Sequence, residues 1–234
     1  MFFLYNHHLN IIKIIILQSR NPKKSTRSRI IESAKKLFAE QGYQKTTVID
    51  ISRQVGLSEA ALYEYFKNKE DLLLTIPDLW VSDLLADLDG QLFGIKGTVN
   101  KLRKFFWWYL RQVEQSPLDA KIVYLILKTN ANFMTTEVFS NVKILYSHLL
   151  DIFEEGRESG ELRPNLKPYL ARAIFIGTMD HIITRWFLKN MSYSLFDNLE
   201  ELFNLMVDGF RNPSTIAANH DGEEANGIKL NKEC

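Results

Sequence analysis

Apolar residues recur at helical spacing along most of this 234-residue chain. From Ser28 onward, the positions i, i+1, i+4, i+7 and i+8 are occupied by Ile30, Ile31, Ala34, Leu37 and Phe38. This spacing is typical of an amphipathic helix with one buried face. Alternating apolar and polar runs bounded by turn dipeptides, which indicate strands, hardly occur. The sequence therefore predicts an all-α fold, and its 46% hydrophobic residues supply a large core.

Glycines, prolines and small hydroxyl residues divide this helical pattern. Gly42 and Gly56 predict the ends of the first two helices, while Thr47 and Ser58 are suited to cap the second and third. Pro77 predicts a kink in the fourth. Later helices are expected at about 69–92, 97–115, 117–131, 134–158, 168–190 and 195–211.

The first three predicted helices have the order of a helix-turn-helix, with a glycine turn between the second and third. A small shared core is expected from Val48, Ile51, Val55, Leu57, Leu62 and Phe66. Two interpretations fit this order, a compact structural subdomain and a DNA-binding module. The spacing favours DNA binding, because a tight turn presents the third helix to the major groove.

The third helix has an inward face and two flanking tyrosines. At about 100° per residue, Leu62 and Phe66 point inward and Tyr63 and Tyr65 lie on either side of them. Tyrosines so placed can pack their rings inward and offer hydroxyls to DNA phosphates. Glu64 points outward, where it either accepts from a cytosine amino group or leans away from the phosphates; leaning away is favoured.

Charge is unevenly distributed along the chain. The segment from Arg20 to Asp71 carries 11 Lys and Arg against 7 Asp and Glu, whereas the whole chain has a formal net charge of only +1. A basic module on a neutral body indicates phosphate contact, although a solvated surface gives the same count.

The two ends of the chain differ from its helical centre. Residues 1–24 are expected to form a flexible extension or short helix, because the apolar run 14–17 is too short to span a membrane and no secretory signal pattern is present. Residues 213–234 are polar and aperiodic, which predicts a disordered tail. Cys234 is the only cysteine, so no intrachain disulfide or zinc finger can form. A cytoplasmic protein without stable membrane insertion is expected.

Four motifs follow one another between residues 30 and 73: A-x-x-L-F-x-x-x-G-Y, T-T-V-x-x-I, V-G-L-S and L-Y-x-Y-F-x-N-K-E-x-L. In combination they resemble the DNA-binding domain of TetR-family transcriptional regulators. The resemblance implies a DNA-binding domain over 25–71, with contacts from Thr47, Ser58, Glu59, Ala60, Ala61, Tyr63, Tyr65 and Lys69. Two departures are Ile49, where the family often has arginine, and Tyr65, where it usually has histidine.

A second pattern, A-R, G-T-x-D, T-x-W and Y-x-L, falls between Ala171 and Leu195. It is similar to the acyl-CoA-responsive fatty-acid-metabolism regulators of the same family, which implies a hydrophobic effector such as a long-chain acyl-CoA. The aromatic run "KFFWWYL" from Lys104 and aromatic residues of neighbouring helices are suited either to a core or to an apolar cavity. Candidate ligand-binding residues are Phe105, Trp108, Tyr109, Tyr124, Phe133, Tyr146 and Asp180.

The predicted helix 168–190 is apolar almost all round, so it must be buried on more than one side. One side can pack within its own domain, 72–212, and the other against a second subunit together with the last helix. Candidate residues of a homodimer interface are Phe175, Met179, Ile182, Trp186, Leu202, Phe203, Met206 and Phe210. Two-fold symmetry then predicts a palindromic double-stranded DNA operator.

Other functions remain open from the sequence. A sensor of assorted lipophilic drugs in the same family is an alternative to an acyl-CoA sensor. An all-α enzyme is disfavoured, because the E-x-x-H and H-E-x-x-H spacings are absent; no catalytic residue, metal site or cofactor is predicted. A membrane-peripheral protein would use residues 2–17.

Overall fold

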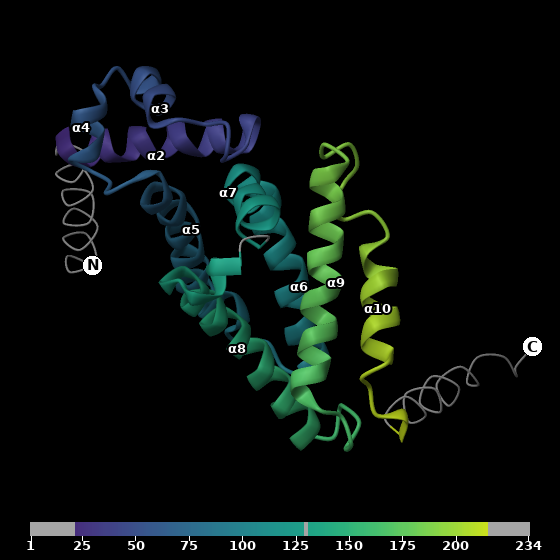
Figure 1. Ribbon diagram of the computed structural model, residues 1–234. Coiled ribbons are helices and arrows are strands. Elements are labelled where there is room, and N and C mark those ends of the chain that lie inside the picture. Colours follow the sequence, from purple (N-terminus) through teal and green to yellow (C-terminus); the bar gives the residue numbers. More distant parts are fainter. Residues whose placement is uncertain (1–21, 129–130, 215–234) are drawn as a thin grey trace, which may run out of the picture. The chain divides into compact units, whose positions relative to one another are not determined.

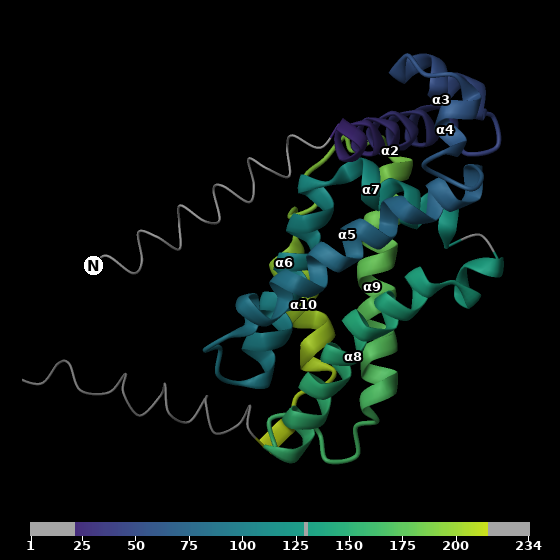
Figure 2. The ribbon, with the colours of Figure 1, turned by 90° about the vertical axis from the view of Figure 1, so that its left-hand side faces the viewer.

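The computed structural model describes residues 22–128 and 131–214, which form helices and one isolated antiparallel bridge between Leu162 and Arg211. This confirms the all-α prediction. The elements in chain order (Figures 1 and 2) are α2 (Pro22–Gln41), α3 (Val48–Val55), α4 (Glu59–Tyr63), α5 (Lys69–Leu92), α6 (Thr98–Gln115), α7 (Pro117–Ile122), the π-helix η1 (Val123–Leu127), the 3₁₀-helix η2 (Ala131–Thr135), α8 (Glu137–Glu158), α9 (Pro168–Leu188) and α10 (Leu199–Asp208). Residues 1–21 and 215–234, which make up most of the expected extension (1–24) and tail (213–234), lie outside the described residues.

Packing divides the described residues into two compact units. The first contains the chain up to Trp80 together with residues 118–128, and the second contains Val81–Pro117 and residues 131–214. Helix α5 contributes to both units, since its first half ends at Trp80. None of the described helices is long and apolar enough to cross a membrane.

Local signals set the ends of α3. Thr47 and Asp50 form a reciprocal capping box, in which the Thr47 Oγ1 accepts from the Asp50 backbone N–H and the Asp50 carboxylate accepts from the Thr47 N–H. Gly56 ends the helix with φ 72°, a left-handed conformation that glycine adopts without steric cost. The predicted cap and stop are both confirmed.

The first unit has a small core that holds the three N-terminal helices together. Its fully or nearly fully buried residues come from α2, α3, α4, α5 and the turn between α4 and α5, namely Ile30, Ala34, Phe38, Ile51, Val55, Leu62, Phe66, Leu72 and Ile76. Arg29 donates to the Val55 carbonyl at 2.7 Å, and the Ser33 hydroxyl donates to Gln54 at 2.8 Å. These bonds join α2 to the end of α3, so the position of α3 on α2 is fixed by polar as well as apolar contacts.

An ion pair attaches α7 to α2 within the first unit. The Lys35 ammonium lies 2.9 Å from Asp119 and 2.9 Å from Glu32, and the side chains of Lys35 and Asp119 are each only 14% exposed. Burial opposes the charge on Lys35, but hydrogen bonds to two carboxylates outweigh it and raise its pKa. Burial also raises the pKa of Asp119, because Lys35 offsets the desolvation only in part.

Three helix boundaries differ from the prediction. The expected helix 117–131 changes at Val123 into a π-helix, where the Lys128 N–H donates to the Val123 carbonyl at 3.0 Å. The next long helix begins at Glu137 rather than 134, because the Thr136 side chain caps it. The last helix begins at Leu199 rather than 195, because Asn198 takes a left-handed conformation with φ 56°.

The second unit is built on α6, α8 and α9, which pack against one another (Figure 1). Phe175 of α9 is its central ring. It contacts Phe105 and Phe106 of α6 and Phe153 of α8 edge to face, at centroid distances of 6.3, 5.3 and 6.0 Å. A single aromatic cluster therefore joins the three helices.

A polar junction closes one end of this unit. Glu161, in the loop after α8, accepts hydrogen bonds from the Thr98 and Val99 backbone N–H groups at the start of α6. Gly97 has no side chain to cap that helix, so Glu161 supplies the missing acceptor from a distant part of the chain. The Asn212 N–H donates in turn to the Glu161 carbonyl at 2.9 Å, which attaches the segment after α10 to the same place.

Candidate nucleic-acid interface and exposed body face

The short helix α4 presents a small, mixed surface. Ser58, Glu59, Ala60 and Tyr63 are exposed, and the Tyr63 side chain is 49% accessible. Leu62 and Phe66, expected on the inward face, are buried. The predicted division of this segment into an inward and an outward face is confirmed.

The helix itself is shorter than the sequence pattern suggests. Helix α4 ends at Tyr63, and Glu64 follows as its C-cap. The Tyr65 and Phe66 N–H groups both donate to the Leu62 carbonyl, so Tyr65 lies in a tight turn and is half-buried. Ala61 is also half-buried. Tyr63 is thus the more accessible of the two tyrosines.

Thr47 and Ser58 use their hydroxyls to cap helices. The Thr47 Oγ1 also donates to the Asp50 carboxylate at 2.6 Å, and the Ser58 Oγ accepts from the Ala61 N–H at 3.2 Å. The hydrogen bonds from the Thr47 side chain and backbone lower the pKa of Asp50. Both residues remain exposed, so a DNA contact is sterically open to them.

Lys69 was expected to point an ammonium at DNA from the start of α5. The structure instead turns it inward. Its Nζ donates to the carbonyls of Tyr43 and Thr46, each at 2.9 Å, and lies 4.2 Å from the centroid of the Tyr43 ring. Lys69 therefore holds the turn between α2 and α3, and its contact with DNA stays a prediction.

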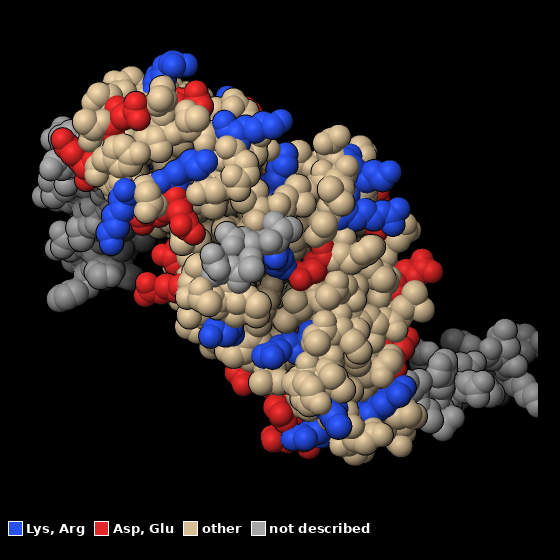
Figure 3. Space-filling model, viewed as in Figure 1, with Lys and Arg blue, Asp and Glu red and all other residues tan. Residues whose placement is uncertain are grey.

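Charges on the first unit are mixed in sign. The space-filling view shows basic and acidic side chains interspersed on the face that it displays (Figure 3). Arg53 and Lys67 are exposed, whereas Arg27 lies over the Phe66 ring at 4.9 Å. The basic side chains of the first unit that are accessible to DNA phosphates therefore lie at scattered positions.

The candidate ligand-binding residues fall in both units. Tyr124 belongs to the first unit, and the other six belong to the second. Phe105 and Tyr109 are buried and stacked at 6.2 Å, and the Trp108 indole N–H donates to Asp87 at 2.7 Å. Phe133 is buried against Phe139. Tyr146 and Asp180 are half-buried. A role in ligand binding stays a prediction for all seven.

The candidate dimer residues separate into two groups. Five of them are buried inside the protomer: Phe175, Met179, Trp186, Phe203 and Phe210. These pack in the chain's own core, because helix periodicity alone does not say which side of an all-apolar helix faces inward. Ile182, Leu202 and Met206 are half-buried and partly accessible.

Other apolar residues of the same two helices are exposed. Ile174 of α9 is 55% accessible and Leu205 of α10 is 69% accessible, and the exposed side of α9 continues through Leu170, Gly177, His181, Arg185 and Leu188. We call this stripe, together with Leu202, Leu205 and Met206, the α9/α10 face. Sequence reasoning missed Ile174 and Leu205 as interface candidates, because an apolar helix pattern does not show which apolar residues the protomer leaves exposed.

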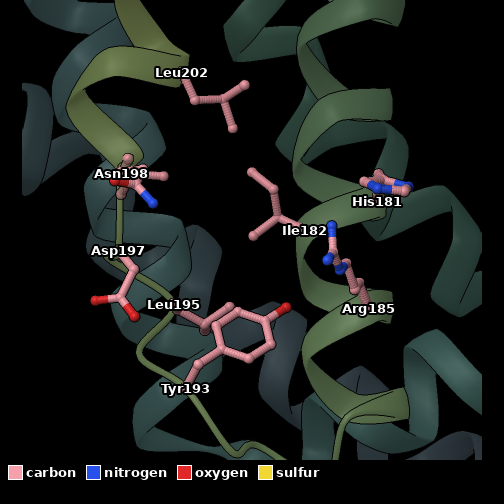
Figure 4. Close-up of a pocket in the computed structure, with 9 residues that line it drawn as sticks. His181, Ile182, Arg185, Tyr193, Leu195, Asp197, Asn198 and Leu202 are labelled. Carbon is pink, nitrogen blue, oxygen red and sulfur yellow. The ribbon is translucent and has the colours of Figure 1, made fainter.

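An open pocket of about 470 Å³ lies on this side, between α9 and the segment that leads into α10 (Figure 4). Its floor is apolar, with Ile182, Leu195, Leu199 and Leu202. Its polar lining residues are His181, Arg185, Tyr193, Asp197 and Asn198. The loop is held over the helix because the Trp186 indole N–H donates to the Tyr193 carbonyl at 2.8 Å. The W and Y of the pattern noted above thus belong to one hydrogen bond.

A capped helix, a glycine turn and a short, exposed second helix are the arrangement of a helix-turn-helix DNA-binding protein. The comparisons with known proteins agree. Residues 30–76 match the model of bacterial regulatory proteins of the tetR family, and residues 81–209 match that of the YsiA-like protein C-terminal region. The chain belongs to the tetR family of transcriptional regulators.

Similar proteins cover most of the chain. A fatty acid metabolism regulator protein of Bacillus subtilis is 27% identical over 191 residues, which is 81% of this chain and 98% of the relative. The repressor KstR2 of Mycolicibacterium smegmatis is 26% identical over 172 residues, 70% of this chain and 80% of the relative.

Among solved structures, the transcriptional regulator FadR of Bacillus subtilis in complex with stearoyl-CoA has a TM-score of 0.71 and 26% identity. The match covers 78% of this chain and 98% of that one. The family and these relatives are regulators, which confirms the prediction that the chain is not an enzyme. Within the described residues, no group of His, Cys, Asp and Glu is arranged to hold a metal ion.

Proposed function

We propose that this transcriptional repressor acts in the cytoplasm as a homodimer that leaves a palindromic operator when it binds a long-chain acyl-CoA. One observation supports the proposed effector. The chain matches nearly the full length of a FadR whose structure contains stearoyl-CoA, through both the N-terminal helices and the helical body. The division of labour is the expected one, with DNA binding in 25–71 and effector binding and dimerisation in 72–212.

The exposed end of α4 is the proposed reading surface. Glu59 and Ala60 are exposed beside Tyr63, and Ala61 is small enough to let a base edge approach. Tyr63 is assigned a phosphate contact through its hydroxyl. The Glu64 side chain forms no hydrogen bond or ion pair with any described residue, so its carboxylate is available at the same surface.

For the effector, the aromatic residues of α6 and α8 are the proposed apolar lining. A coenzyme A head group also needs cations for its phosphates. Of the three basic residues near the start of α6, Lys101 pairs with Glu155 and Arg103 pairs with Glu200. Lys104 has no ion pair with a described residue, so we assign it the phosphate contact.

The α9/α10 face is the proposed dimer interface. Ile174, Leu202, Leu205 and Met206 give it apolar surface that the protomer leaves accessible. A two-fold dimer places its two reading helices about 34–36 Å apart, or at a multiple of one DNA turn. Effector binding need only change the preference between two arrangements of the dimer, and about 1.4 kcal/mol of differential binding lowers DNA affinity tenfold.

The direct test is fluorescence anisotropy with labelled DNA from upstream of the chain's own gene, over a range of salt. We expect a sequence-dependent complex that stearoyl-CoA dissociates, while stearate and free coenzyme A serve as controls. Absence of sequence-dependent binding would contradict the operator proposal. Release by assorted lipophilic drugs but not by stearoyl-CoA would replace the effector with the multidrug alternative.

Two variants examine the reading surface in the same assay. Tyr63→Phe removes one hydroxyl and is expected to weaken binding to all sequences by a similar factor, because a phosphate contact carries no base information. Glu64→Ala changes sequence preference only if the carboxylate reads a base. Unchanged affinity for Tyr63→Phe would show that the phosphate assignment is wrong.

A further inference from the structure

The pocket on the α9/α10 face carries two opposite charges that its own chain does not pair. Arg185 comes from α9, and Asp197 comes from the segment leading into α10; Figure 4 shows them on opposite sides of the pocket. Neither side chain forms an ion pair or hydrogen bond with any described residue. A cation and an anion are thus displayed together with no use inside the protomer.

We propose that Arg185 of one copy pairs with Asp197 of a second copy, and Asp197 of the first with Arg185 of the second. This inference rests on the homodimer proposed above and identifies the residues that set its register. A two-fold interface is self-complementary, since a contact between residue i and residue j of the other copy occurs twice. One unpaired cation and one unpaired anion on the same face are the minimum set for such a reciprocal pair.

The position of Asp197 is well defined by its loop. Asn190, Met191 and Asn198 all have positive φ, between 51° and 56°. Left-handed backbone at non-glycine residues persists only where the surroundings hold it in place. Here the Trp186 N–H bond to the Tyr193 carbonyl and the Asp197 N–H bond to the Ser194 carbonyl at 3.2 Å hold the loop. The carboxylate is therefore presented from a constrained turn.

The surroundings of the pocket strengthen such a pair. Its floor is formed by Ile182, Leu195, Leu199 and Leu202, of which Leu195 and Leu199 are buried in the protomer. A second copy that covers the pocket removes water from the two charges, and their attraction rises as the local dielectric falls. The exposed Ile174 and Leu205 lie on the same face and supply apolar contact around it.

A pair of this kind gives specificity. A partner without matching charges at these positions would leave Arg185 and Asp197 unpaired in the interface. An unpaired charge buried against a wrong partner is costly, so the reciprocal pair selects a second copy of this chain.

Charge reversal in the full chain tests the inference. In a dimer of Arg185→Asp, both contacts between positions 185 and 197 join two carboxylates. In a dimer of Asp197→Arg, both join two guanidinium groups. We expect each variant to raise the dimer dissociation constant by at least about tenfold in sedimentation velocity. An equimolar mixture of the two variants restores both pairs, since every contact then joins an Asp to an Arg. The mixture is expected to form a heterodimer with nearly wild-type affinity.

The mixture distinguishes contacts between copies from contacts within one. If the double variant R185D/D197R dimerises like wild type but the mixture of single variants does not, the pair is intrachain and the inference is wrong. If both single variants dimerise with the affinity of wild type, the inference is also wrong. The homodimer proposal survives that result as long as the wild-type protein is dimeric. A monomeric wild type at micromolar concentration would overturn the homodimer itself. Circular dichroism of each single variant verifies that it is folded.

Discussion

The reading segment around α3 and α4 and the aromatic centre of the second unit are stabilised in different ways. In the first, Thr47, Asp50, Gly56 and Ser58 set the helix ends through bonds between residues at most a few positions apart. In the second, Phe175 joins α6, α8 and α9 through rings that lie far apart in the sequence. A short surface helix therefore depends on its caps, while a long buried helix depends on what packs around it.

The largest expected effect is in the aromatic centre. Phe175→Ala removes a fully buried ring that touches three other rings. We expect a loss of about 3–5 kcal/mol in the free energy of unfolding, measured by chemical denaturation. The matched control is Tyr169→Ala on the same helix, where the side chain is 54% exposed. A control loss equal to that of Phe175→Ala would contradict the central role of this ring.

The second effect breaks the ion pair between α2 and α7. Lys35→Met leaves Asp119 without its cation, and we expect a loss of about 2–3 kcal/mol, somewhat below the range for fully buried pairs because both side chains are 14% exposed. The double variant K35M/D119L removes both charges and should recover most of this loss. A double variant as unstable as Lys35→Met would show that packing rather than charge dominates.

The pH dependence of Lys35→Met has a defined sign. Burial already raises the pKa of Asp119 in the presence of Lys35, and loss of the cation raises it further. The folded variant therefore binds a proton more tightly than the unfolded chain does. The stability lost in Lys35→Met relative to wild type is therefore smallest below the pKa of the carboxyl group in the unfolded chain. The loss grows as pH rises through the pKa of Asp119 in the folded variant. A deficit independent of pH would contradict this.

A smaller effect is expected at the cap of α3. Thr47→Ala removes the hydroxyl that accepts from the Asp50 N–H, at a loss of about 1 kcal/mol. Thr47→Ser retains that hydroxyl and should lie close to wild type. Thermal unfolding followed by circular dichroism measures both. If Thr47→Ser were as unstable as Thr47→Ala, the methyl group rather than the cap would be responsible.

The smallest effect concerns the other half of the same capping box. Hydrogen bonds from Thr47 lower the pKa of Asp50, so its contribution to stability is present above the unfolded carboxyl pKa and is lost as pH falls through the folded pKa. The melting-temperature difference between wild type and Asp50→Asn should therefore shrink with acidification. A difference that grows toward low pH would reverse the assignment.

The same contrast explains what the sequence could predict. Helix starts at Thr47 and Ser58 and the stop at Gly56 were predictable, because each depends on neighbours within a few positions. The start of α10 was harder to predict, since no strong local sequence pattern indicates that Asn198 takes a left-handed conformation. The π-helix at Val123 also depends on more than the apolar pattern around it.

Side-chain directions were harder to predict than helices. Lys69 bonds to carbonyls 26 and 23 residues before it, and a helical wheel contains no information about that turn. Phe175 and Ile174 are adjacent and both apolar, yet one is buried and the other exposed. Only the packing of α6 and α8 decides between the two sides of α9. The exposed residues of α4 were easier to predict, because a surface helix has a polar side that marks its outward direction.

The junction at Glu161 has a consequence for the order of folding. Its carboxylate binds N–H groups 63 and 62 residues earlier, and its carbonyl binds Asn212, 51 residues later by position in the chain. Such a junction can close only after α6, α8 and α10 have been brought together, because each separation carries a loop-closure entropy. We therefore expect it to form after the main barrier, so that Glu161→Gln accelerates unfolding and leaves the refolding rate nearly unchanged.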